Sequence, residues 1–176
     1  WGRDSQLAMS GIGAHGTFVH LYLNGIYWGL YNPCERPDEN YLSDNFGGQD
    51  EDWYAGKDGL DLSRDNSEWT NLLVTCGNTN TDWTAYSAYT NVQKYLDMTN
   101  FCDYVLLWWY RGGGDWEEGD NCKNFYVGNR NSTNPTPISY YCWDMEMSWA
   151  PGSVSSDGAW AHPAFLLTTP SSTNGS

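Results

Sequence analysis

The sequence predicts an α+β fold, because a β-hairpin near its start is followed by a series of helical segments and then by a strand near residue 140. At 176 residues, the chain has the length of one domain. Its apolar runs all fall short of the roughly 18 residues that a membrane helix requires, so we expect no membrane span in this chain.

The hairpin is the clearest local pattern. Two β-rich runs, residues 18–23 and 26–31, flank Asn24-Gly25, the residue pair that favours a type I′ turn. Beyond Pro33, an Asp cap and a Glu within residues 35–42 predict the start of a short helix, and Gly47-Gly48 predicts its end.

Three further helices are expected, after an acidic, glycine-dotted stretch at 49–65 that has loop character. Ser67 can cap the first, and apolar spacing of three and four residues predicts the second at 86–96. Thr99 or Asn100 could cap the third, which is apolar on nearly every face around Trp108 and Trp109 and is therefore expected in the core.

Acidic residues follow two of these buried elements. Gly112 to Gly114 end the third helix and lead into Asp115, while a strand at 138–143 leads into Asp144, so we expect the two to lie together. Oxygen ligands of this kind suit Mg²⁺ or Mn²⁺ in phosphoryl transfer. Spacing alone fits equally well with residues that cap neighbouring elements or form an acidic rim.

Charge and cysteine content restrict the class of protein. The net charge of −14 would repel a phosphate backbone, so nucleic acid is not an expected partner. Five cysteines without a C-x-x-C pair give no support to a zinc ribbon or a thioredoxin motif, which leaves disulfides or plain burial.

Four blocks resemble the CotH kinase family, the atypical kinases named for a bacterial spore coat protein. They are F-V-H-L-Y-L-N-G-I-Y-W-G-L-Y-N-P-C-E-R at 18–36, Y-L-D-M-T-N-F-C-D-Y at 95–104, G-D-W at 114–116 with N-F-Y at 124–126, and W-D-M-E at 143–146. The resemblance implies an atypical protein-kinase-like fold that transfers the γ-phosphate of ATP, with Mg²⁺ or Mn²⁺, to Ser or Thr of a partner protein. Family members on spores and fungal cell surfaces imply a secreted or surface location.

The resemblance also implies roles for individual residues. Asp115 would orient or deprotonate the acceptor hydroxyl, and Asp144 would bind metal. Asn124 is the preferred Asn ligand, with Asp120 and Asn121 as competitors. Glu146 would be a ligand or support one.

Two further residues and the domain limits follow by the same analogy. Glu35 would order a phosphate-contacting lysine, and Lys57 is a candidate for that lysine, although a surface position fits it better. Residues 1–167 would form a partial kinase domain, with the hairpin from the small lobe and a mainly helical large lobe, and 168–176 a Ser/Thr/Pro-rich linker or tail.

Two other functions are compatible with the sequence. The 11 Trp and 13 Tyr residues would suit a carbohydrate-binding surface module, in which exposed rings stack on sugars. A pseudokinase or surface adhesin is the other alternative, because glycines precede Asp115 where the family commonly has Asn, and Glu117 to Lys123 lengthen the following loop.

Overall fold

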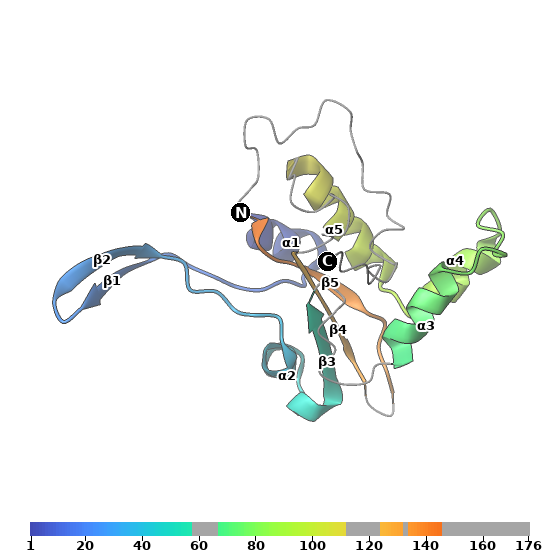
Figure 1. The fold of residues 1–176 in the computed structure, drawn as a ribbon, viewed down its shortest axis with the longest axis horizontal. Helices are drawn as coiled ribbons and strands as arrows, with labels where there is room; N and C mark the ends of the chain where they lie inside the picture. Colours follow the sequence, from blue (N-terminus) through green and yellow to red (C-terminus); the bar gives the residue numbers. More distant parts are fainter. Residues whose placement is uncertain (58–66, 112–123, 132–133, 146–176) are drawn as a thin grey trace, which may run out of the picture.

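The computed structural model describes residues 1–57, 67–111, 124–131 and 134–145, and its architecture is α+β, as the sequence predicts (Figure 1). The elements in chain order are α1 (Gly2–Ser10), β1 (Val19–Leu23), β2 (Ile26–Tyr31), α2 (Glu39–Phe46), η1 (Asp50–Asp52), β3 (Trp53–Lys57), α3 (Ser67–Cys76), α4 (Tyr86–Val92), α5 (Met98–Arg111), β4 (Phe125–Arg130) and β5 (Ser139–Cys142).

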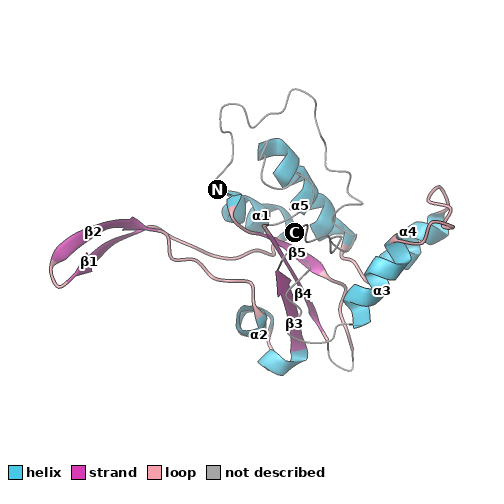
Figure 2. Ribbon diagram, in the orientation of Figure 1, coloured by secondary structure: helices cyan, strands magenta, loops and turns pink. Residues whose placement is uncertain are grey.

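The strands form two separate antiparallel sheets (Figure 2). Strands β1 and β2 make the predicted hairpin, with Asn24 (φ 50°) and Gly25 (φ 78°) both in the left-handed region that a type I′ turn requires. This hairpin projects away from the other elements in Figure 1. The second sheet has the order β3-β4-β5 and lies among the helices.

The main core lies between helix α5 and the three-stranded sheet. Trp108 and Tyr104 of α5 are almost completely buried, as is Tyr140 of β5. The Tyr140 ring lies 5.1 Å from Phe101 and 5.3 Å from Tyr104, within the range of favourable aromatic contacts. The prediction that Trp108 belongs to the core is therefore confirmed, and Trp109 is partly buried against the same cluster.

Two buried amide side chains pair with the backbone of β5, which is an edge strand of its sheet. Asn100 on α5 accepts from Tyr140 N–H at 2.6 Å and donates to Tyr140 O at 3.1 Å. Gln6 on α1 donates to the same Tyr140 O at 2.7 Å and accepts from Cys142 N–H at 2.9 Å. Both side chains are only 1% exposed, so these amides occupy the place of a fourth strand and fix α1 and α5 against β5.

Several local expectations need correction. Residues 53–57, expected within a loop, form β3, because Trp53 to Gly56 are buried and pair with β4. The helix expected at 86–96 ends at Val92, and Leu96 instead bridges to Ile138. The third helix begins at Met98, and Asp97 provides its cap by accepting from Asn100 N–H at 3.1 Å. Helix α1 and strand β4 were not predicted.

The helix after the hairpin follows its sequence signals. Asp38 caps α2 by accepting from Tyr41 N–H at 3.1 Å, and Gly47, with φ 80°, ends it. The four described cysteines, Cys34, Cys76, Cys102 and Cys142, form no disulfide with one another. No helix in the described ranges is both long and apolar enough to cross a membrane.

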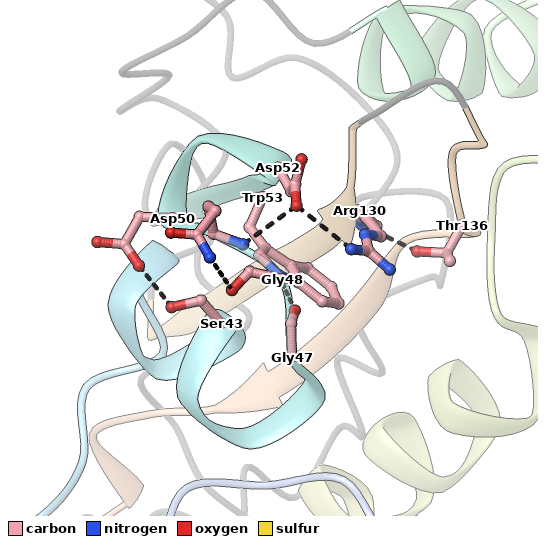
Figure 3. Close-up of polar contacts among 9 residues, drawn as sticks. Ser43, Gly47, Gly48, Asp50, Asp52, Trp53, Arg130 and Thr136 are labelled. Atoms are coloured by element: carbon pink, nitrogen blue, oxygen red, sulfur yellow. Dashed lines mark hydrogen bonds and ion pairs between the residues drawn. The ribbon is translucent and has the colours of Figure 1, made fainter.

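A polar network ties α2 and η1 to one end of the three-stranded sheet (Figure 3). Arg130, at the end of β4, contacts the Asp52 carboxylate at 3.2 Å, and Gln49 N–H donates to the same oxygen at 3.1 Å. Trp53 Nε1–H donates to Gly47 O at 2.8 Å. These contacts lie at the opposite end of the sheet from Lys57 and Asn124.

Replacing Asn100 tests the importance of the amide pairing. In Asn100→Ala, the buried N–H of Tyr140 loses its acceptor, and we expect unfolding free energy to fall by about 1–3 kcal/mol. Urea denaturation would measure this loss. Asn71→Ala, at an exposed position of α3, should change stability by no more than about 0.5 kcal/mol. Equal stability of the two variants would contradict the proposed structural role.

The Asp52 contact predicts a pH-dependent stability. Hydrogen bonds from Gln49 N–H and the Arg130 guanidinium lower the pKa of the Asp52 carboxyl below its usual value. The stabilisation is therefore present above the unfolded pKa of about 4 and is lost as pH falls towards the folded pKa. The melting temperature of the wild type should exceed that of Asp52→Asn at pH 7, and the gap should narrow below about pH 4. Asp44→Asn, at an exposed position of α2, should show no such gap.

Candidate functional site

Three of the residues singled out from the sequence lie at one end of the β3-β4-β5 sheet. Lys57 ends β3 and pairs with Tyr126, Asn124 immediately precedes β4, and Asp144 follows β5 by two residues. Because Phe125 pairs with Cys142 in the antiparallel register, the chain enters β4 and leaves β5 at the same place. Sequence reasoning expected Asn124 and Asp144 to share a site, and the register brings their backbones together.

The backbone at this sheet end has an uncommon conformation. Asn124 has φ 71° and Asp144 has φ 55°, and the only other non-glycine residue with positive φ in the described ranges is Asn24 of the hairpin turn. Asn and Asp tolerate the left-handed region better than other L-residues, but it still costs free energy. Residues in such conformations persist only where the surrounding structure holds them in place. They occur more often at functional sites than elsewhere.

Asp144 lines a pocket of about 640 Å³. The pocket is lined by three segments: residues 1–4 of α1 and its cap, the hairpin base at 16–18, 32 and 34, and residues 142–145. Asp144 is exposed, and it makes no hydrogen bond or ion pair with any other residue that the structure describes. Its carboxylate is therefore available to a ligand.

The helix that forms one wall of the pocket approaches Asp144 closely through Gly2. A Cβ added at Gly2 would overlap the Sδ atom of Met145 and lie 3.3 Å from its Cβ. The absence of a side chain at residue 2 therefore lets α1 pack directly against the residue that follows Asp144. The pocket wall was missed by sequence reasoning, since residues 2–10 carry no strong apolar periodicity.

The donor atoms at this sheet end fit a hard divalent cation. Mg²⁺ and Mn²⁺ prefer oxygen, and Mg²⁺ is commonly held by one or two carboxylates together with substrate phosphates. Asp144 is such a carboxylate, and Asn124, whose side chain is 6% exposed, is an amide at the same sheet end. No group of three His, Cys, Asp or Glu side chains able to hold a metal occurs in the described part of the chain.

Glu35 occupies a different position. It is half-buried beside His15, which contacts its Oε2 through both the backbone N–H and ring Nδ1, each at 2.7 Å. Burial raises the pKa of the Glu35 carboxyl, but the hydrogen bonds from His15 outweigh it and leave the pKa below its usual value. Glu35 does not line the pocket, and its side-chain contacts among the described residues are with His15 and Asn45 rather than with a lysine.

The remaining candidates are placed as follows. Lys57 is half-buried at the end of β3 rather than fully on the surface. Asp115, Asp120, Asn121 and Glu146 lie outside the described residues, as does the expected tail at 168–176.

Comparison with known proteins identifies the family. The sequence model described as CotH kinase protein matches residues 9–165, most of the chain. The protein belongs to the CotH kinase family. No curated protein matches it. The matched range of this CotH-family chain contains Asn124 and Asp144 but not Arg3, which lines the pocket together with Asp144.

The left-handed backbone at Asp144 gives a stability test. Asp144→Ala should be less stable than Asp144→Gly by about 1 kcal/mol, because Ala carries a Cβ that crowds the following carbonyl at positive φ. Chemical denaturation of both variants would measure the difference. At Asp103, within α5, the order should reverse, since Gly costs about 1 kcal/mol relative to Ala in a helix. The same order at both positions would contradict the backbone assignment.

Proposed function

We propose that this CotH-family protein is an atypical protein kinase that transfers the γ-phosphate of ATP to Ser or Thr of a partner protein, with Mg²⁺ or Mn²⁺ as the metal. The observation that carries the proposal is the placement of Asp144. Its carboxylate, which has no partner among the described residues, lies in a pocket of about 640 Å³, directly after a buried strand. Membership of a kinase family supports phosphoryl transfer as the chemistry.

The order of elements supports the same reading. In protein kinases, an Asn that follows the catalytic Asp and the Asp of the Asp-Phe-Gly motif hold the metal ions. Here Asn124 and Asp144 flank the β4-β5 pair in that order, at a shared sheet end. Asn124 and Asp144 would hold the cation, which neutralises charge on the phosphates when bound. Asp115 would take the role of the carboxylate that positions the acceptor hydroxyl.

We further propose that the protein acts outside the cell, either secreted or on the cell surface, on a protein acceptor. The hairpin would belong to the small lobe of a kinase-like fold and α5 to the large lobe. The net charge of −14 disfavours nucleic acid as an acceptor and leaves protein hydroxyl groups as the simplest choice.

A charge-removing substitution at Asp144 tests the proposal. Asp144→Asn keeps the side-chain shape and the tolerance for positive φ, so the fold should persist. The metal would lose its carboxylate, and we expect metal-dependent phosphate transfer to fall roughly a thousandfold. Radiolabelled ATP, Mn²⁺ or Mg²⁺ and a Ser-rich acceptor protein would measure the rate, with far-UV circular dichroism as the folding measurement.

The control for this experiment is Asp103→Asn, which removes the same charge from α5 and should retain full activity. Equal labelling by Asp144→Asn and wild type would remove Asp144 from the mechanism. Absence of labelling by wild type with either metal would favour a pseudokinase or surface adhesin. Among the exposed rings that a sugar-binding module would use are Trp28 (59% exposed) and Trp83 (52% exposed), and glycan binding without nucleotide would favour that alternative.

A further inference from the structure

We propose that Arg3 is an anion-binding residue of the Asp144 pocket and that it takes phosphate oxygens of a metal-bound polyphosphate. This inference rests on the proposed function and adds to it a cationic group that lies outside the residues matched by the family. Arg3 and Asp144 line the same pocket, Arg3 from the first turn of α1 and Asp144 from the chain after β5.

The charge of Arg3 is not neutralised within the described ranges. The Arg3 guanidinium donates through Nη2 to the amide oxygen of Asn32 at 2.6 Å and makes no ion pair there. Asn32 is itself held by donating to Thr17 O at 2.7 Å. A neutral amide thus fixes the direction of the guanidinium while leaving its positive charge and its other N–H groups available.

The backbone beside Arg3 leaves space for this side chain. An ideal Cβ at Gly16 would lie 2.5 Å from Arg3 Nη2 and 2.8 Å from its Cζ, so any larger residue would displace the guanidinium. Gly16 lies in the hairpin base, and its backbone also bridges to Cys34. The guanidinium therefore occupies a defined place against the chain rather than extending freely into solvent.

The helix that carries Arg3 is fixed relative to Asp144. Gln6, one turn further along α1, is bonded to both Tyr140 and Cys142 of β5, and Gly2 packs on Met145. The positions of the Arg3 cation and the Asp144 carboxylate are thus set by the same strand. A polyphosphate would satisfy both, because a cation held by Asp144 and the planar guanidinium fork would each contact different phosphate oxygens.

A purely structural role for Arg3 is the competing explanation, since its hydrogen bond joins α1 to the hairpin base. The two roles predict different variants to fail. Arg3→Gln removes the charge and, because Gln is shorter than Arg, also the hydrogen bond to Asn32, so both roles predict a change in this variant. Asn32→Asp keeps an acceptor for the guanidinium but places a carboxylate against it, which would compete with an anionic ligand. A structural contact would be retained or strengthened in Asn32→Asp, whereas anion binding would weaken.

Titration calorimetry of the full chain with Mn²⁺ would test the proposal, using ATP, inorganic tripolyphosphate and adenosine as separate ligands. We expect Arg3→Gln to weaken ATP and tripolyphosphate binding by roughly ten- to a hundredfold, the range for a hydrogen bond to a charged group. Asn32→Asp and Gly16→Ala should also lower the affinity for both ATP and tripolyphosphate. Lys94→Gln, which removes one positive charge from an exposed position after α4, is the matched control and should leave both affinities unchanged.

The outcomes separate this inference from the proposed function. Unchanged affinities in a folded Arg3→Gln and in Asn32→Asp would overturn the inference while leaving the kinase proposal intact. Arg3-dependent binding of tripolyphosphate without binding of ATP would support the anion site and contradict the use of ATP. Binding of neither phosphate ligand by wild type, or binding of adenosine as tight as that of ATP, would overturn the anion site. Thermal melting of each variant checks that it is folded.

Discussion

The structure depends on how the edge strand β5 satisfies its backbone hydrogen bonds. A buried strand edge needs partners, and here they are two side-chain amides rather than another strand: Gln6 from α1 and Asn100 from α5. Each amide bonds one backbone N–H and the same carbonyl of Tyr140, so the two helices are fixed in register as well as in distance. Burial of Tyr140 against Phe101 and Tyr104 then excludes water, which strengthens these bonds.

The candidate site follows from that arrangement. Strand β5 ends at Cys142, whose backbone N–H donates to the Gln6 side chain. This bond fixes the position of the strand end from which the chain continues to Asp144. Helix α1, held by the same Gln6, brings Arg3 to the other side of the pocket. The Asp52–Arg130 network lies at the opposite end of the sheet, whereas residues 142–145, which follow β5 at the Asn124 end, line the pocket. Stability and site geometry therefore share the same few hydrogen bonds.

The sequence predicted those parts whose signals are local. The Asn24-Gly25 turn, the Asp38 cap and the apolar helix around Trp108 depend on nearby residues, and all three are confirmed. Strand β3 was missed, because its burial comes from pairing with β4, about seventy residues later. Helix α1 was missed for the same reason: Gln6 is 1% exposed only because β5, 134 residues away at Tyr140, accepts its hydrogen bond. A polar residue at a core position gives no periodic apolar signal.

The same distinction explains the outcome at the site. Asn124 and Asp144 could be selected from residue type and family resemblance, and their shared sheet end follows from the antiparallel pairing of β4 and β5. Arg3 could not be selected in this way, because nothing near it in sequence indicates a ligand. Its relevance arises from Gly16 and Asn32 of the hairpin base and from Asp144 after β5, two segments that meet α1 at one pocket. A carboxylate and a guanidinium that share a pocket without forming an ion pair remain available to a ligand that carries both a cation and phosphate oxygens.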